Sequence, residues 1–429
     1  MPFVSDLRTV LRGRGFRRLF TVRLASQASD GAFQAALASL VFFSPERAAT
    51  AHAAAAAFAV SVLPYTLVGP FAGVLLDRWR RRQVLLVANA VRTLMVVAVA
   101  LLVSQHVVGA GLYVGALACL SVNRFFLTGL GASLPHVVST DELVMANSVS
   151  PTCGTIMSIL GGGAAYGVRE LLGASDRTDA VLLLLAAAGY AASALLTLRL
   201  GAGQLGPDRD AELRPARGFQ AIVDGARHVH HRRPAWNALG AVGVHRFAYG
   251  ITVITTLLLC RNYFNDPADV DAGLRLLALA FGASAVGFGL AALLTPPAAE
   301  RWGPGGFIWR CFAVAAVVES VFISWFTVPV ALTGALVLGV CAQGSKICVD
   351  SIVQAYVDDD YRGRVFAFYD MVFNLAFVVA AAAAALMLPS DGYSRGVFAV
   401  VAVLYLLAAF GYGRTVHVVA APERSGRAG

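Results

Sequence analysis

The chain of 429 residues is poor in charged residues, which make up 14% of it against about 25% in a typical soluble domain. Lysine is nearly absent, because Lys346 stands alone beside 33 arginines. A soluble surface needs more charge than this to stay hydrated, so the composition excludes an ordinary soluble globular protein. The arginine bias, together with abundant Ala, Gly and Val, indicates a bacterial genome of high GC content.

Motifs for metal, nucleotide or covalent chemistry are also missing. The six cysteines lie in apolar segments without a CxxC pair, so they predict neither a disulfide framework nor a zinc site. His228, His230 and His231 have no cysteine or carboxylate at ligand spacing. Gly161 to Gly163, and Gly167 after them, are not followed by the Lys-Ser/Thr of a phosphate-binding loop, so they indicate close helix packing instead. We therefore expect no enzyme activity, metal or cofactor, and no direct use of ATP.

Long apolar blocks are what the chain has in abundance. It is 58% hydrophobic with a mean hydropathy of +0.69, and its blocks of about 20 residues are long enough to cross a bilayer as helices. The sequence therefore predicts an all-α polytopic membrane protein with about twelve transmembrane helices. The expected spans are 19–43, 53–76, 83–105, 110–134, 146–172, 179–199, 235–260, 273–296, 305–327, 329–353, 365–388 and 395–416.

The net charge of +9 is distributed as in a membrane protein. Of the 34 Lys and Arg residues, 22 lie in the termini and in loops of one parity, six lie on the opposite side, and six fall within spans. This bias predicts a multi-pass protein of the bacterial cytoplasmic membrane with both termini in the cytoplasm. A nucleic acid is not expected as a partner, because the basic residues are not gathered on one domain.

One long polar stretch divides the spans into two sets of six. We expect a first half at 1–199, a cytoplasmic linker at 200–233 and a second half at 234–429. Within the linker, apolar residues from Phe219 to Val229 follow one helical face, which predicts an amphipathic helix on the cytoplasmic membrane surface. The tripeptides Asp77-Arg78-Trp79 and Glu300-Arg301-Trp302 recur after the second span of each half, which favours an internal duplication.

The segment GVLLDRWRRR, from Gly73 to Arg82, resembles the loop between helices 2 and 3 of the major facilitator superfamily. Three further segments resemble its macrolide-efflux and enterobactin-exporter branch of drug:proton antiporters: SLPHVVSTDELVMANS (Ser133 to Ser148), DGARHVHHRRP (Asp224 to Pro234) and QAYVDDDYRGRVFAFYD (Gln354 to Asp370). The resemblance implies two pseudo-symmetric six-helix halves, the major facilitator fold, and transport by alternating access.

The resemblance also implies a cytoplasmic gate. The loop residues Gly73, Asp77, Arg78 and Arg81 would latch this face against the start of the eleventh helix, at Arg364. The simpler alternative is that the loop arginines only set the membrane topology.

A polar stripe on the first span is the best candidate for proton coupling. Gln27, Asp30 and Gln34 lie on one helical face with Arg23. A carboxyl group in a water-poor site binds a proton more readily unless a cation pairs with it. The resemblance places an arginine of the fourth helix, Arg124, beside this acid. The alternative is that Asp30 is a hydrogen-bonded structural residue.

Other charged residues within spans are secondary candidates, because a buried charge costs roughly 2.5–3.5 kcal/mol and needs a partner or a water-filled cavity. Lys346 and Asp350 are four residues apart, so we expect an ion pair on one helical face. Glu319, Asp370 and Asn374 are further candidates for a site in the second half.

The sequence therefore predicts a monomeric secondary transporter that exports amphiphilic small molecules, with the proton gradient as its energy source. A lipid or siderophore translocator of the same fold is an alternative, and a non-transporting membrane sensor or assembly partner is another. The retained charges Asp30 and Arg124 disfavour the last of these, because a scaffold has no need of their desolvation cost. We expect small residues and aromatic side chains to line the substrate cavity, among them Phe33, Phe125, Phe126, Tyr249, Phe373 and Asn374.

Overall fold

The computed structural model describes residues 2–38, 79–105, 110–173, 175–206, 219–266 and 270–420. These residues form thirteen α-helices, short 3₁₀ turns (η2 and η3) and one π-helical turn, η4 (Leu259–Tyr263). The α-helices are α1 (Pro2–Arg12), α2 (Arg14–Ala38), α4 (Arg81–Ser104), α5 (Ala110–Ser133), α6 (Leu143–Leu172), α7 (Asp176–Thr197), α8 (Phe219–His231), α9 (Arg233–Leu258), α10 (Val270–Trp302), α11 (Pro304–Ser324), α12 (Val328–Tyr356), α13 (Asp359–Met387) and α14 (Arg395–Ala420).

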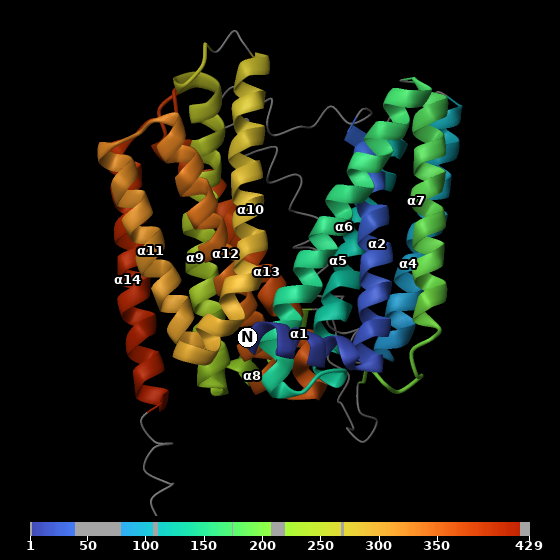
Figure 1. The fold of residues 1–429 in the computed structure, drawn as a ribbon, viewed down its shortest axis with the longest axis horizontal. Helices are drawn as coiled ribbons and strands as arrows, with labels where there is room; N and C mark the ends of the chain where they lie inside the picture. Colours follow the sequence, from blue (N-terminus) through green and yellow to red (C-terminus); the bar gives the residue numbers. More distant parts are fainter. Residues whose placement is uncertain are drawn as a thin grey trace, which may run out of the picture.

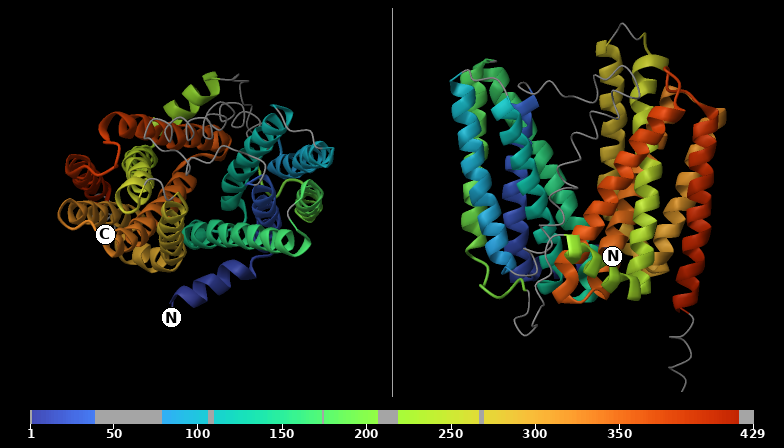
Figure 2. Two further views of the ribbon diagram at one scale, coloured as in Figure 1. Left: turned by 90° about the horizontal axis from the view of Figure 1, so that it is seen from above. Right: turned by 180° about the vertical axis from the view of Figure 1, so that it is seen from behind.

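The long helices form two groups that stand side by side (Figure 1). One group, the N-terminal half, contains α2 and α4 to α7, and the other, the C-terminal half, contains α9 to α14 (Figure 2). The two groups converge at the end where α1 and α8 lie, which we call the linker end, and diverge toward the opposite end. The exact division at 199/200 and 233/234 stays a prediction.

The helices have the dimensions and surfaces of membrane spans. Within the described ranges, ten helices are long and apolar enough to cross a membrane. Helix α2 has 25 residues but is less apolar, because it carries the stripe from Arg23 to Gln34. The expected span 53–76 lies outside the described residues. Large apolar side chains cover the outer faces, with Leu171 and Leu386 more than 80% exposed, as lipid contact requires. The all-α membrane fold predicted from the sequence is confirmed.

The apolar cores lie almost entirely within the halves. Two clusters are built from residues of the N-terminal half alone, and another from the C-terminal half alone. The largest cluster belongs to the C-terminal half and takes in one buried residue of the other half, Ala132 of α5. The predicted lining residues Phe33 and Phe126 are buried in the N-terminal clusters, so this part of the predicted cavity lining is wrong.

Helices α2 and α6 approach so closely that glycine is required at their contact. A Cβ atom on Gly161 would overlap the carbonyl oxygen of Ala28, and one on Gly31 would overlap that of Ser158. By contrast, nothing lies within 4 Å of the Cβ positions of Gly163 and Gly167. The prediction of close packing is therefore confirmed for Gly161 and wrong for Gly163 and Gly167. This contact fixes the depth of α2, and with it the position of its polar residues.

Helix α8 forms where the linker was predicted to be amphipathic, but its apolar face packs on protein. Ile222 and Val229 are buried, and α8 contacts α13 and α9. The His228 ring stacks on Tyr361 at 4.2 Å between centroids, and Arg232 donates to Asp358 at 2.7 Å. The predicted placement of this apolar face on the membrane surface is wrong, because the first turns of α13 cover it.

Candidate substrate and coupling site

A polar cavity of about 100 Å³ lies between the halves. Helices α2, α5 and α6 supply one wall, and α12 and α13 supply the other. Its charged lining residues are Arg23, Arg124, Lys346, Asp350 and Asp370. Such a set is costly inside a membrane protein and is usually retained for function. We call this space the interface cavity.

The ion pair between Lys346 and Asp350 is confirmed. Lys346 Nζ lies 2.6 Å from Asp350 Oδ2, along one face of α12 as their spacing predicts. Tyr369 of α13 donates its hydroxyl to the other carboxylate oxygen at 2.7 Å. Both oxygens of Asp350 are thus occupied within the C-terminal half.

Asp370 is held by two residues of the opposite half. Arg124 Nη2 of α5 donates to Asp370 Oδ1, and Thr128 Oγ1, one turn along the same helix, donates to Oδ2 at 2.7 Å. The predicted proximity of Arg124 to Asp30 is therefore wrong. Arg124 faces the interface between the halves, whereas Asp30 faces the interior of its own half.

Asp30 belongs to a buried network within the N-terminal half. Arg92 Nη2 of α4 pairs with Asp30 Oδ1, and Tyr190 Oη of α7 donates to the same oxygen at 2.8 Å. The Arg92 guanidinium also lies 3.8 Å above the Tyr190 ring and donates to Ser26 at 3.0 Å. Asp30 is 4% exposed and does not line the interface cavity.

The predicted stripe on α2 divides between two neighbours. Gln27 accepts from Arg23 Nε at 2.9 Å and lies against Gly154 of α6, whereas Asp30 turns toward α4 and α7. Gln34 is exposed and makes no hydrogen bond with the described part of the chain. The structure therefore does not bring Gln34 to the candidate site.

Two secondary candidates of the C-terminal half have local partners. Asn374 donates to the backbone oxygen of Asp370 at 2.8 Å, one turn back along α13. Glu319 is fully buried and accepts from Thr252 Oγ1 at 2.7 Å. Its other oxygen has no partner among the described residues. Neither residue lines the interface cavity.

Hydrogen bonds also join the halves below the cavity, toward the linker end. Asn147 of α6 donates to Ser351 at 3.1 Å and to Gln354 at 2.6 Å. Gln354 in turn donates to the backbone oxygen of Gly131 at 3.1 Å. All three polar side chains are buried, so this layer closes the cavity toward the linker end.

A second contact layer at the linker end centres on Arg81. Its fully buried guanidinium donates to Asp359 Oδ1 at 3.0 Å and to the Ala132 oxygen at 3.0 Å. His136 Nε2 lies 3.2 Å from Asp359 Oδ2, and Arg362 also pairs with this carboxylate.

The structure describes only some of the predicted gate residues. Gly73, Asp77 and Arg78 lie outside the described residues. Arg364, predicted as the partner, stacks on Tyr361 at 5.1 Å. The acceptor for Arg81 is instead Asp359.

Sequence reasoning missed Asp359, Arg92 and Tyr190 as partners. Asp359 lies in a run of three aspartates at the start of α13, where the helix dipole favours carboxylates, so the sequence did contain a pattern that indicates this residue. Arg92 was one of three arginines within spans of the N-terminal half. Charge alone could not decide which of them pairs with Asp30.

Among the described residues, no group of three or more His, Cys, Asp or Glu side chains is placed to hold a metal ion. What the arrangement can do is bind a polar group between two bodies and change that binding when the bodies move. This is the design of a carrier with a central site between two halves.

The fold and this interface define the class, a polytopic membrane carrier. The sequence matches the Major Facilitator Superfamily over residues 19–276 and 241–428, and the chain belongs to this family of transporters. It is 38% identical over 411 residues to uncharacterized MFS-type transporters of Mycobacterium tuberculosis and Mycobacterium bovis. Each match covers 94% of this chain and 90% of the relative.

Solved structures of low sequence identity share the fold. A bacterial homologue of the iron transporter ferroportin in the outward-facing state has a TM-score of 0.69 at 14% identity, covering 93% of this chain and 98% of that one. The fucose:proton symporter of E. coli has a TM-score of 0.69 at 12% identity, with the same coverage. The human organic anion transporter TETRAN has a TM-score of 0.68 at 15% identity, covering 92% and 99%.

Proposed function

We propose that the protein is a secondary transporter of the bacterial cytoplasmic membrane that exports amphiphilic small molecules in exchange for protons. The observation that carries the proposal is the contact of Asp370 with Arg124 and Thr128 across the interface between the halves. Alternating access must separate these residues in one of its states. A carboxylate that loses a cationic partner in a water-poor site binds a proton more readily, so the movement and the proton are linked.

Asp370 is a better candidate for the coupling acid than Asp30. The partners of Asp30, Arg92 and Tyr190, lie in the same half, so a rigid movement of the halves leaves this pair intact. Asp350 is likewise paired with Lys346 on its own helix. Of these three acids, Asp370 is the one whose described side-chain partners lie in the opposite half, so its environment changes directly with the movement.

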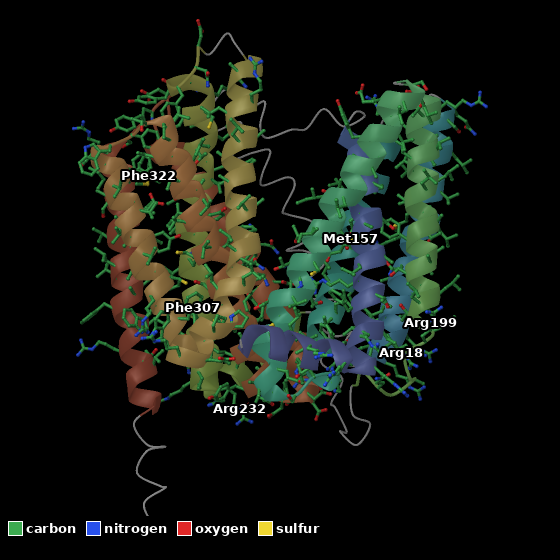
Figure 3. The ribbon with its side chains drawn as sticks, viewed as in Figure 1. Arg18, Met157, Arg199, Arg232, Phe307 and Phe322 are labelled. Carbon is green, nitrogen blue, oxygen red and sulfur yellow. The ribbon has the colours of Figure 1, made fainter. Side chains whose placement is uncertain are left out.

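We further propose that the linker end faces the cytoplasm. The labelled side chains Arg18, Arg199 and Arg232 all lie at this end (Figure 3), as the bias of basic residues toward the cytoplasm requires. In that orientation the contacts of Arg81 and Asn147 close the cytoplasmic side, and the conformation is outward-facing. Accessibility of cysteines introduced at 205–215 and at 265–271 tests the orientation, since exposure of 205–215 on the outer side would contradict it.

Transport into proteoliposomes with an acid interior tests proton antiport. We would use three dansyl probes that share one fluorophore: dansylglycine is anionic, dansylamide neutral and dansylcadaverine cationic. An antiporter accumulates at least one probe against its gradient, in excess of protein-free liposomes. Asp370→Asn should abolish this pH-driven accumulation while downhill exchange of the probe remains.

Asp391→Asn, in the loop between α13 and α14, is the matched control and should behave as the wild type. Wild-type accumulation by Asp370→Asn would remove Asp370 from the coupling role. Transport of a probe that is indifferent to the pH gradient would refute proton antiport. Accumulation only with an alkaline interior would indicate symport, and therefore import.

A further inference from the structure

The membrane interior of this protein carries more cations than carboxylates can balance. Three of the cations are each paired with a carboxylate: Arg92 with Asp30, Arg124 with Asp370, and Lys346 with Asp350. Three arginines remain without a carboxylate among the described residues. Arg310 stacks on Trp302 and Trp309 and does not line the cavity, whereas Arg23 and Arg246 lie on α2 and α9. These helices are the first of their respective halves.

Arg23 lines the interface cavity and is held by neutral groups. Its Nε donates to Gln27 Oε1 at 2.9 Å, and its Nη1 donates to Ser150 Oγ at 3.2 Å. Both partners are acceptors without charge, so they orient the guanidinium and leave its positive charge uncompensated. Asp350 lines the same cavity, but Lys346 already neutralises it.

Arg246 is held by aromatic rings instead of acceptors. Its guanidinium lies 4.3 Å from the Phe373 ring centroid and 4.4 Å from that of Phe377. Stacking on a ring occupies the face of a guanidinium, while its N–H groups point outward in the plane and stay available as donors. Arg246 makes no hydrogen bond or ion pair with the described part of the chain. This is a preorganised cation with unused donors.

The two arginines belong to the same region. Arg246 stacks on Phe373, whose ring centroid lies 6.3 Å from that of Tyr369, and Tyr369 lines the interface cavity together with Arg23. Glu319, the remaining buried acid, interacts with Thr252 and not with Arg246. The excess positive charge is therefore concentrated at the cavity.

We propose that this region binds the substrate as an amphiphilic organic anion, with Arg23 and Arg246 attracting its carboxylate, sulfonate or phosphate group and Phe373 and Phe377 contacting its apolar body. The proposal rests on the proposed function, since it names the substrate class of the same transport site. The cavity of about 100 Å³ holds a headgroup, and the apolar body extends toward the end where the halves diverge. Guanidinium groups suit this task because they bind such oxyanions with two parallel hydrogen bonds.

Equilibrium binding to the purified full-length protein tests the proposal without any pH gradient. Energy transfer from tryptophan to the dansyl group reports binding of the same three probes. Dansylglycine should bind at least ~10-fold more tightly than dansylamide and dansylcadaverine, the size expected for one charge-assisted hydrogen bond. Arg23→Gln and Arg246→Gln should each remove most of this preference, whereas Arg310→Gln should retain it. Arg310 is an intramembrane arginine that stacks on Trp302 and Trp309, away from the cavity.

A second measurement covers the case in which the dansyl group does not fit. The unfolding temperature would be followed with benzoate, benzenesulfonate and phenyl phosphate, and with benzyl alcohol and benzylamine at the same ionic strength. At least one anion should raise it in the wild type and not in Arg246→Gln. The anion that raises the unfolding temperature most indicates whether the site prefers a carboxylate, a sulfonate or a phosphate group. Neither variant loses an ion pair, so without ligand both should remain folded, and the loss of the hydrogen bonds of Arg23 or of the stacking of Arg246 should lower the unfolding temperature only modestly.

The proposal is overturned if neither measurement shows a preference for anions, or if the preference survives in both arginine variants. These outcomes are separate from those of the proposed function. Proton-driven accumulation of dansylcadaverine without anion binding would sustain the antiporter and refute the anion site. Anion binding without proton-driven accumulation would sustain the anion site and refute the antiporter.

Discussion

The buried pair of Arg92 and Asp30 allows a quantitative test of what the acid of the first span does. In Arg92→Gln, the Asp30 carboxylate keeps the Tyr190 hydroxyl but loses the one cationic partner that it has among the described residues. In Asp30→Asn, the Arg92 guanidinium keeps Ser26 and Asn89. Either change leaves a buried charge uncompensated, which costs about 3–5 kcal/mol in free energy of unfolding.

The double variant Asp30→Asn/Arg92→Gln removes both charges at once. It should lose only about 1–2 kcal/mol, for the altered hydrogen bonds and packing. The coupling energy of the cycle would then be at least about 4 kcal/mol in favour of the pair. Equilibrium unfolding in mixed micelles containing SDS measures all four proteins under one condition.

The same double variant separates a structural role from a coupling role. If Asp30 only closes the N-terminal network, the double variant keeps pH-driven accumulation in proteoliposomes. If Asp30 carries the proton, accumulation is lost although stability is recovered. The structural argument is refuted if Arg92→Gln alone is as stable as the wild type, or if the double variant is no more stable than the single ones.

Three further predictions concern packing, the linker-end contacts and pH. Gly161→Ala forces a Cβ atom into the Ala28 carbonyl and should lower the free energy of unfolding by about 1–3 kcal/mol. Gly163→Ala should leave it unchanged or raise it slightly, so equal unfolding midpoints of the two variants would contradict this packing. Asp359→Asn removes the negative charge that pairs with Arg81 across the halves, so spin labels at the linker end should report a larger open fraction in distance measurements. An unchanged distribution would show that this ion pair does not hold the closed state. Burial lowers the pKa of His228 below its ordinary value of 6.5, so the docked state favours the neutral ring, and docking of α8 should weaken as the pH falls below about 6.5. Hydrogen exchange in α8 should then rise on acidification in the wild type and not in His228→Gln.

The sequence predicted the helices well because a membrane span is a local property. A run of apolar residues of sufficient length needs no knowledge of its neighbours to be read as a helix, and the ion pair of Lys346 with Asp350 followed from a four-residue spacing on one helix. The candidate charged residues were found for the same reason, since any charge in an apolar run stands out.

The pairings between helices could not be predicted in this way. Asp30 lay within reach of three arginines on three helices, and the choice of Arg92 depends on which face of α2 meets α4. That orientation is set by the contact of Gly31 and Gly161 between α2 and α6. The apolar face of α8 was visible in the sequence, but whether lipid or α13 covers it depends on tertiary packing.

The separation of apolar clusters within the halves from polar contacts between them has an energetic consequence. When the linker end opens, side chains such as Asn147, Gln354 and Ser351 exchange hydrogen bonds with one another for hydrogen bonds with water. Each exchange changes the free energy by only about 0.5–1.5 kcal/mol, while the apolar clusters of each half remain undisturbed apart from the contact of Ala132. The two conformations can therefore stay nearly equal in population. A solute that binds one conformation only modestly more tightly than the other is then enough to change which of the two is more populated.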